Sequence, residues 1–294
     1  MGIALDVLVV GEALIDIVES GSDVHEHVGG SPANVALGLG RLGVNAALLT
    51  QVGDDERGKR IMSHIEGSGA RILRESVDSR PTSTARARIA EDGAADYVFD
   101  IHWEALPDAA YPAPRLVHTG SIGAFAEPGA ESVVELLSQI GAQEVTFDPN
   151  IRPALVGERD DALRRFEQIC GLATVVKMSD EDAAWLFPGS TPDEVIDRTL
   201  AMGPRVVAVT LGGDGAILAS AADRVRIAPV AVAVADTIGA GDTFMTSLIN
   251  SVLETGSSAL SRTDLERIGT AAARAAAITV SRAGADLPWA RELV

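Results

Sequence analysis

The segment DTIGAGD at residues 236–242 combines acidic side chains with glycines where a helix is expected to begin. It follows an apolar run, and apolar side chains then recur with helical spacing from 244 to 253. The N-terminus of a helix has unpaired backbone N–H groups and the positive end of the dipole, and both favour an anion. Glycines there lack the Cβ atoms that would obstruct a phosphate. We therefore predict an anion site at Gly239, Ala240 and Gly241.

Asp242 follows these residues in the first turn of the same helix. A carboxylate repels a phosphate, so it is badly placed to bind one, but it is well placed to accept a proton from a hydroxyl group that attacks the phosphate. An aspartate in a first turn can also serve only the helix dipole. The GAGD cluster, together with Asp236, favours the catalytic interpretation. The pattern thus indicates phosphoryl transfer with Asp242 as general base.

Two other glycine motifs do not support nucleotide binding. GLGRLG at 38–43 matches a dinucleotide fingerprint, but its glycines are expected near the end of a helix rather than between a strand and a helix. A nicotinamide-dependent dehydrogenase is therefore disfavoured. GDDERGKR at 53–60 resembles a P-loop, but Arg60 replaces the hydroxyl residue and three acidic side chains would repel a triphosphate. We expect the start of a capped helix there.

The composition limits the partners. The chain has 294 residues and a formal net charge of −18, which argues against nucleic acid or an anionic membrane as a partner. Lys59 and Lys177 are the only lysines, and Cys170 is the only cysteine, which fits a reducing compartment. No apolar run approaches the roughly 20 residues of a membrane span, and the N-terminus lacks a basic signal-peptide region. We expect a cytoplasmic protein.

The elements that position these residues alternate between short apolar segments and longer segments of helical periodicity. This alternation is typical of an α/β fold with a mostly parallel, doubly wound sheet. Strands are expected at 5–10, 46–50, 116–119, 144–147, 174–177 and 206–210. Helices are expected at 32–42, 56–68, 130–140, 158–170, 192–202, 240–254 and 264–281.

Residues 12–28 and 80–103 interrupt the alternation because they have strand-like polar alternation without a long helix between strands. We expect them to form either a small β layer over a site or ordinary surface hairpins, and the pattern alone does not separate the two. The whole chain, 1–294, is expected to form a single domain, with this layer as its appendage.

The chain resembles the ribokinase-like (PfkB) carbohydrate kinases. DTIGAGD is similar to the second signature of that family, and GGSPANVA at 29–36 is similar to the first. Further likeness covers nearly the whole chain, at VGDDERG 52–58, FDPNIRPAL 147–155, KMSDEDAAWLF 177–187, TLGGDGA 210–216 and SRAGAD 281–286. The resemblance implies a three-layer ribokinase-like sandwich with a small β lid, ATP as phosphate donor and a sugar as acceptor. It implies the same roles for Asp242 and the anion hole.

The resemblance also implies binding residues. Asp16, Gly30 and Asn34 match positions that hold sugar hydroxyls, for which a carboxylate and an amide are suitable partners. Ser31 and Pro32 are expected as N-cap and first residue of the helix that carries Asn34.

TLGGDG at 210–215 matches a loop that approaches the nucleotide, with Thr210, Gly212, Gly213 and Gly215 as candidates. By itself the motif would be interpreted as a plain hairpin turn.

The same resemblance implies a site for a monovalent cation and, separately, one for Mg²⁺. Asp236, the Ile238 carbonyl and the segment near Gly284 resemble a monovalent-cation site, whose oxygen ligands suit K⁺.

Family members often have N-x-x-E where this chain has Ser179-Asp180-Glu181-Asp182. Ser179 is expected beside the nucleotide. Either Glu181 or Asp182 is expected to organise Mg²⁺ through water, as this ion tolerates.

The expected substrate is fructose, because GEALIDIV at 11–18 and FDPNIRPAL resemble fructokinases. A 2-keto-3-deoxygluconate kinase shares the D-x-N-x-R pattern and is the close alternative. Its acidic substrate needs a basic clamp, which Arg86, Arg88 and Arg152 could supply, but Asp100 disfavours an acid. Another sugar or nucleoside kinase of the family and a non-catalytic sugar-binding relative are further alternatives. The resemblance also implies a homodimer formed through the lid.

Overall fold

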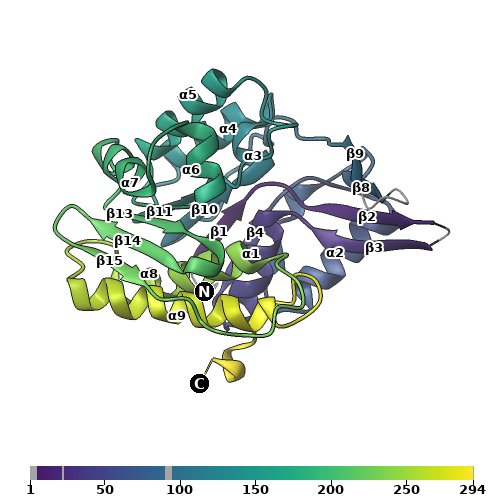
Figure 1. Cartoon of the computed structure of the whole chain (residues 1–294). Helices are drawn as coiled ribbons and strands as arrows, with labels where there is room; N and C mark the ends of the chain where they lie inside the picture. Colours follow the sequence, from purple (N-terminus) through teal and green to yellow (C-terminus); the bar gives the residue numbers. More distant parts are fainter. Residues whose placement is uncertain (1–4, 22, 90–94, 294) are drawn as a thin grey trace.

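The computed structural model describes residues 5–21, 23–89 and 95–293, and within them a large, mostly parallel sheet forms the centre of the molecule (Figure 1). The strands have consecutive apolar, often β-branched residues, as in VLVV and VVAVT, because helices bury both faces of the sheet. In spatial order the strands are β15 (Arg224–Ile227), β14 (Ala216–Ser220), β13 (Val206–Thr210), β12 (Val175–Ser179), β11 (Glu144–Asp148), β10 (Leu116–Gly120), β1 (Val7–Val10), β4 (Ala46–Leu49) and β6 (Arg71–Ile72).

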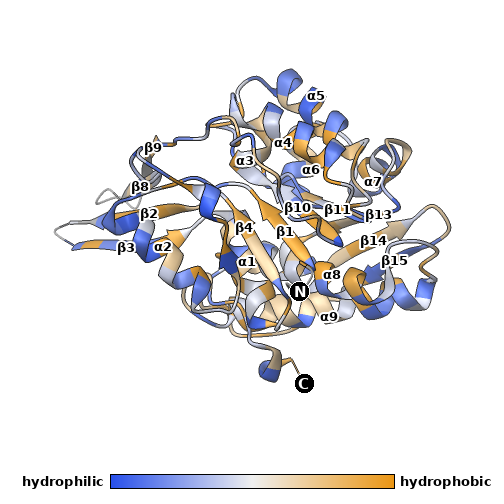
Figure 2. Ribbon diagram, turned by 180° about the vertical axis from the view of Figure 1, so that it is seen from behind, coloured by the Kyte–Doolittle hydropathy of each residue, from blue (hydrophilic) through white to orange (hydrophobic). Residues whose placement is uncertain are grey.

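Helices cover the two faces of this sheet and make three layers. One face packs against α1 (Ser31–Arg41), α2 (Glu56–Glu66), α8 (Ala240–Thr255) and α9 (Arg262–Val280). The opposite face packs against α3 (Ser121–Phe125), α4 (Gly129–Gln139), α5 (Arg159–Cys170), α6 (Asp180–Leu186) and α7 (Pro192–Ala201). Figure 2 shows mostly apolar central strands between helices that combine polar and apolar residues. The expected α/β fold with a doubly wound sheet is confirmed.

The direction of winding reverses at β1. This strand pairs with β4 on one side and with β10 on the other, both in parallel. In open α/β sheets, ligands bind outside the carboxyl ends of the strands at such a reversal. Glu12 follows β1, Ser121 follows β10, Asp148 ends β11 and Ser179 ends β12. The topology thus gathers polar residues from four separate segments at one edge of the sheet.

A second sheet lies beside the main one and has the order β3–β2–β8–β9. Its strands are β2 (Leu14–Ser20), β3 (Asp23–Gly29), β8 (Thr84–Ile89) and β9 (Ala95–Asp100). They belong to the segments 12–28 and 80–103, of which residues 22 and 90–94 lie outside the described residues. Ile15 and Ile17 of β2 are buried and join this small sheet to the core. Its function as a cover over the site stays a prediction.

Short elements complete the described part of the chain. Strands β5 (Val52–Gly53) and β7 (Val77–Asp78) pair in parallel. The 3-10 helices are η1 (Arg74–Ser76), η2 (Gly212–Asp214) and η3 (Ala290–Glu292). None of the helices in the described residues is long and apolar enough to cross a membrane.

The structure differs from the sequence-based expectations in a few elements. Strands β14 and β15 were not expected; they extend the sheet antiparallel to β13, and only the first residue of the apolar run 227–235 belongs to a strand. The predicted N-cap was also wrong: Gly30 is the N-cap of α1, and Ser31 is its first residue. The cap position needs a backbone at φ 103°, which glycine adopts without strain.

The two discarded glycine motifs lie where they were expected. Helix α1 ends at Arg41, inside GLGRLG, so those glycines do not open a helix. In GDDERGKR, Asp55 caps α2 by accepting a hydrogen bond from the Gly58 N–H at 2.7 Å.

Candidate active site

The start of α8 presents unused backbone donors. Its N-cap, Gly239, has a left-handed backbone with φ 78°. The Ala240 N–H donates a long hydrogen bond of 3.3 Å to the Thr237 carbonyl. The N–H groups of Gly239, Gly241 and Asp242 have no acceptor within the described residues. This turn can therefore offer several N–H groups to an anion.

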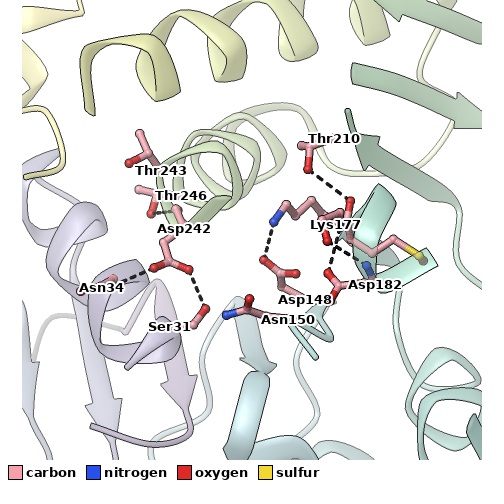
Figure 3. Close-up of polar contacts among 12 residues, drawn as sticks. Ser31, Asn34, Asp148, Asn150, Lys177, Asp182, Thr210, Asp242, Thr243 and Thr246 are labelled. Carbon is pink, nitrogen blue, oxygen red and sulfur yellow. Dashed lines mark hydrogen bonds and ion pairs between the residues drawn. The ribbon is translucent and has the colours of Figure 1, made fainter. Parts of the chain in front are cut away.

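Asp242 is buried at this turn and is held by α1 (Figure 3). Its Oδ1 accepts a hydrogen bond from the Ser31 hydroxyl at 2.6 Å, and its Oδ2 accepts one from the Asn34 amide at 2.8 Å. Donors to an ionised carboxylate form short, strong hydrogen bonds. The carboxylate is therefore fixed in orientation by two residues that are more than 200 positions away in the sequence.

A glycine in α1 allows the two helices to approach each other. A side chain at Gly38 would come within 2.8 Å of Thr246 in α8 and within 2.6 Å of Leu287. Glycine in a helix interior costs about 1 kcal/mol relative to alanine. At this position the cost is offset by the close packing that lets Ser31 and Asn34 reach Asp242.

A buried ion pair lies next to the Asp242 turn. The Lys177 ammonium donates to Oδ2 of Asp148 at 2.8 Å, and both side chains are 5% exposed or less. Burial is the largest influence on each group and favours its neutral form; it raises the pKa of Asp148 to about 6 despite the Lys177 charge. The pKa of Lys177 is nevertheless raised above its usual value, because Asp148, Asp182 and Asp242 surround the ammonium.

Asp182 joins two loops at the same edge. Its Oδ1 accepts from the Ile151 N–H at 2.7 Å, and its Oδ2 accepts from the Ser179 N–H at 2.9 Å. The Ser179 hydroxyl oxygen in turn accepts a hydrogen bond from the Asp182 N–H at 3.0 Å, which completes a capping box at the start of α6. Asp182 is buried, whereas the neighbouring Glu181 is exposed. Of the two acids considered from the sequence, only Asp182 points into the polar cluster.

Asp16 lies at the junction between the small sheet and α1. Burial raises the pKa of Asp16 to about 6, although the charges of Arg152 and His27 favour the ionised form. A side chain at Gly29 would collide with the Asp16 carboxylate, and one at Gly30 would lie 2.6 Å from the Glu12 carbonyl. Glycines 29 and 30 therefore allow β3, Asp16 and the start of α1 to meet.

Glu12 is a further buried carboxyl group near these residues. Its Oε2 accepts from the Gly123 N–H at 2.8 Å. Burial raises its pKa to about 7, even though hydrogen bonds from Gly123 and Ser121 and the charge of Arg152 act in the opposite direction.

The arginines considered as a clamp for an acidic substrate have other partners. Arg86 forms an ion pair with Glu19 inside the small sheet. Arg152 donates to Oδ1 of Asn150 at 2.8 Å. The side chain of Arg88 lies outside the described residues.

The glycine-rich loop after β13 forms η2 and leads into the antiparallel strand β14. Thr210 ends β13, and its hydroxyl donates a long hydrogen bond of 3.4 Å to the Met178 carbonyl. A side chain at Gly212 or Gly213 would meet open space, whereas one at Gly215 would collide with the Ile227 carbonyl. The loop is thus an open surface anchored at its end, compatible with the predicted nucleotide contact and with the plain hairpin.

Asp236 and the segment near Gly284 are brought together, although they are 48 positions apart. One Asp236 oxygen accepts from the Gly284 N–H at 2.9 Å, and the other accepts from the Ile238 N–H at 3.0 Å. These hydrogen bonds fix the loop that precedes α8 and lower the pKa of Asp236.

Three residues of the polar cluster around the start of α8 were not identified from the sequence. The hydroxyl of Ser31 was interpreted as a helix cap instead of a partner of Asp242. Asp148 and Lys177 were quoted only within longer motifs. A lysine inside the apolar segment VVKMS gives a usable signal, because a buried ammonium requires a carboxylate partner.

Comparisons with known proteins identify the family and the fold of the chain. The family model described as pfkB family carbohydrate kinase matches residues 4–291. Fructokinase from Escherichia coli is 31% identical, over 98% of this chain and 97% of that protein. ATP-dependent 6-phosphofructokinase from Thermoanaerobacterium thermosaccharolyticum is 27% identical, over 85% and 82%. The structure of fructokinase with bound ATP from Xylella fastidiosa has a TM-score of 0.83 at 22% identity, and the match covers 98% of this chain and 96% of that one.

Proposed function

Because the chain belongs to the pfkB family of carbohydrate kinases, we propose that it transfers the γ-phosphate of ATP to a hydroxyl group of fructose. Its fold is the ribokinase-like α/β fold. The observation that carries the proposal is the Asp242 carboxylate, which Ser31 and Asn34 hold beside the unused N–H groups that open α8.

In the proposed reaction, Asp242 accepts the proton of the sugar hydroxyl as its oxygen forms a bond to the γ-phosphorus. The bond between that phosphorus and the bridging oxygen breaks, and ADP leaves with the electron pair. The N–H groups at Gly239, Gly241 and Asp242 bind the oxygens of the transferred group. General-base catalysis typically contributes about 10²–10⁴ in rate, and preorganised donors to the developing charge contribute at least as much.

Mg²⁺ is implied by the chemistry, and the residues present fit it. Asp148 has a buried oxygen without a hydrogen-bond partner in the described residues, and Asp182 lies beside it. Across the part of the chain that the structure describes, no group of three or more Asp, Glu, His or Cys side chains is arranged to hold a metal ion. Two carboxylates and several waters suit Mg²⁺, which, when bound, offsets phosphate charge. K⁺ beside Asp236 is a further proposal, since the carboxylate fixes a loop whose carbonyls could serve as ligands.

A neutral sugar fits the proposed sugar site better than an acidic one. Asp16 and Asn34 provide an acceptor and a donor for hydroxyl groups. Arg86 is neutralised by Glu19, so it is a poor clamp for a carboxylate or a phosphate. The alternatives are 2-keto-3-deoxygluconate and another sugar or nucleoside. For 2-keto-3-deoxygluconate, Arg152 is the candidate clamp arginine that has no ion pair in the described residues.

A substrate panel tests this proposal. ADP release is measured with ATP–Mg²⁺ and fructose, ribose, 2-keto-3-deoxygluconate, fructose 6-phosphate or a nucleoside. We expect the highest kcat/KM with fructose, and turnover at least about 100-fold lower in Asp242→Asn. A higher kcat/KM with any other acceptor would reject fructose. Sugar binding without turnover would indicate a non-catalytic relative, and thermal stabilisation by NAD but not by ATP–Mg²⁺ would indicate a dehydrogenase.

We also propose that the protein is cytoplasmic and forms a homodimer through the small sheet. The two edge strands of this sheet each carry an apolar side chain exposed by more than half, Val24 of β3 and Val98 of β9. Exposed edges of this kind readily pair with another chain. Size-exclusion chromatography with light scattering measures the mass of the unchanged protein and of Val24→Lys. We expect a dimer for the unchanged protein and a weakened dimer for the variant, and a monomeric unchanged protein would reject the proposed dimer.

A further inference from the structure

The side chain of Lys177 ends beside the first turn of α8, where the phosphate site is proposed. Lys177 is the middle residue of β12 (Val175–Ser179), and its side chain is buried (Figure 3). An ammonium has three N–H donors. Within the described residues only one hydrogen bond is made, to Asp148.

The glycine at position 241 brings this ammonium close to the anion site. A Cβ atom at Gly241 would stand 2.9 Å from Nζ of Lys177 and, apart from its chain neighbours and the adjacent backbone of α8, would meet no other described atom within 4 Å. Gly241 has one of the unused N–H groups of α8. The ammonium therefore lies against the same turn that would bind the phosphate, and the missing side chain is what gives it that place.

The charge around the site needs a cation. Asp148, Asp182 and Asp242 all act on Lys177, and each is buried. A phosphoryl group would add further negative charge to a region of low dielectric, where repulsion is strong. Lys177 is the only lysine of the chain other than the exposed Lys59.

We propose that Lys177 takes part in phosphoryl transfer, donating a second N–H to an oxygen of the phosphoryl group bound at Gly241. Asp148 holds the ammonium in place, and the side chain completes the row of backbone donors with a full positive charge. This inference rests on the proposed kinase activity. The simpler role, in which Lys177 only neutralises Asp148, makes a different prediction.

The two roles separate in a double-mutant cycle. Lys177→Met is compared with the unchanged protein, and Asp148→Asn/Lys177→Met with Asp148→Asn alone. Removing one phosphate donor typically lowers kcat about 10²–10³-fold. We expect a loss of that order for Lys177→Met, with the KM for the sugar changed less than about threefold, as for a group that acts on the transferred phosphate. When Lys177→Met is added to Asp148→Asn, we still expect kcat to fall at least about tenfold.

The cycle also covers a folding defect. Lys177→Met leaves a buried carboxylate unpaired, but the double variant removes both charges, which proteins often tolerate. If Asp148→Asn has no measurable turnover, the binding affinity for ADP with aluminium fluoride, in the presence of sugar, is measured instead of kcat. We expect this affinity to be weaker in Asp148→Asn/Lys177→Met than in Asp148→Asn. An unchanged value upon adding Lys177→Met to Asp148→Asn would overturn the proposal and leave the neutralising role.

Two controls complete the experiment. Lys59→Met, at the exposed second lysine, is expected to leave kcat unchanged. The unchanged protein is assayed with the same sugar and ATP. If it releases no sugar-dependent ADP, the proposed kinase function fails; if it does and Lys177→Met matches it, only this inference fails.

Discussion

The hydroxyl group of Ser31 donates a hydrogen bond of 2.6 Å to Oδ1 of Asp242, from the first residue of α1 to the first turn of α8. Asn34, one turn further along α1, occupies the other oxygen. The GGSPANVA and DTIGAGD segments thus meet in direct contact. Asn34, one of the residues proposed for the sugar, therefore also orients the proposed base.

Asp242→Asn removes the proposed base while preserving size. We expect turnover to fall at least about 100-fold, because an amide cannot accept the hydroxyl proton. Thermal stabilisation by ATP–Mg²⁺ should remain, since the N–H groups of the turn are unchanged. A coupled ADP assay and a thermal-shift titration measure the two effects. Unchanged turnover would remove Asp242 from the role of base.

Ser31→Ala tests the orientation of the base. A hydrogen bond to a charged group contributes about 1.5–3 kcal/mol, and without it the carboxylate keeps only the Asn34 donor. We expect kcat to fall about tenfold, with a smaller change in the KM for the sugar. Ser31→Thr retains the hydroxyl and serves as the matched variant. If alanine and threonine have the same kcat, the hydroxyl is not needed to orient Asp242.

The sequence was sufficient for those parts of the site that depend on local geometry. Gly239 and Gly241 were placed at a helix start because apolar periodicity follows them, and the position of a helix start is a local property. Asp242 was assigned from its place in the first turn of that helix, Asn34 was assigned by resemblance, and the structure brings the two into contact. The central strands were expected for a similar reason, since their apolar runs are continuous.

What could not be predicted depends on contacts between distant segments. The Asp148–Lys177 pair joins two neighbouring parallel strands, and its formation requires the register of β11 against β12. The cap of α1 was misplaced because Ser31 has the side chain of a good N-cap, whereas the backbone at φ 103° requires Gly30. Tertiary contact with Asp242 therefore decided the role of Ser31.

Glu12 gives the folded protein a measurable pH dependence. Its pKa is about 7 in the folded state against an ordinary value of 4.5. Between these values the folded protein holds a proton that the unfolded chain has released. The free energy of unfolding therefore falls as the pH rises from about 4.5 to 7, by at most about 3 kcal/mol from this group.

Glu12→Gln removes this titration, and its side-chain oxygen can still accept from the Gly123 N–H. We expect the variant to match the unchanged protein near pH 5 and to be more stable at pH 8. Urea unfolding at both pH values provides the measurement. Equal differences at the two pH values would contradict a buried, titrating Glu12.

Gly241→Ala adds one methyl group between the start of α8 and Lys177. The backbone of residue 241 is not in the left-handed region, so alanine fits the helix and gains about 1 kcal/mol in propensity. The methyl group would stand 2.9 Å from the Lys177 nitrogen and displace it from the turn. We therefore expect unfolding free energy to be maintained while kcat falls at least about tenfold.

Gly171→Ala is the matched control, because Gly171 is the C-cap that follows α5, with a backbone that alanine also adopts. A Cβ atom there would make an ordinary nearest contact of 3.4 Å. This variant should leave kcat unchanged. Pairing Gly241→Ala with Lys177→Met then identifies the cause. If the methyl group acts by displacing the ammonium, the two losses are not additive, and the double variant is about as slow as Lys177→Met. Fully multiplied losses would instead mean that the methyl group obstructs the phosphate directly.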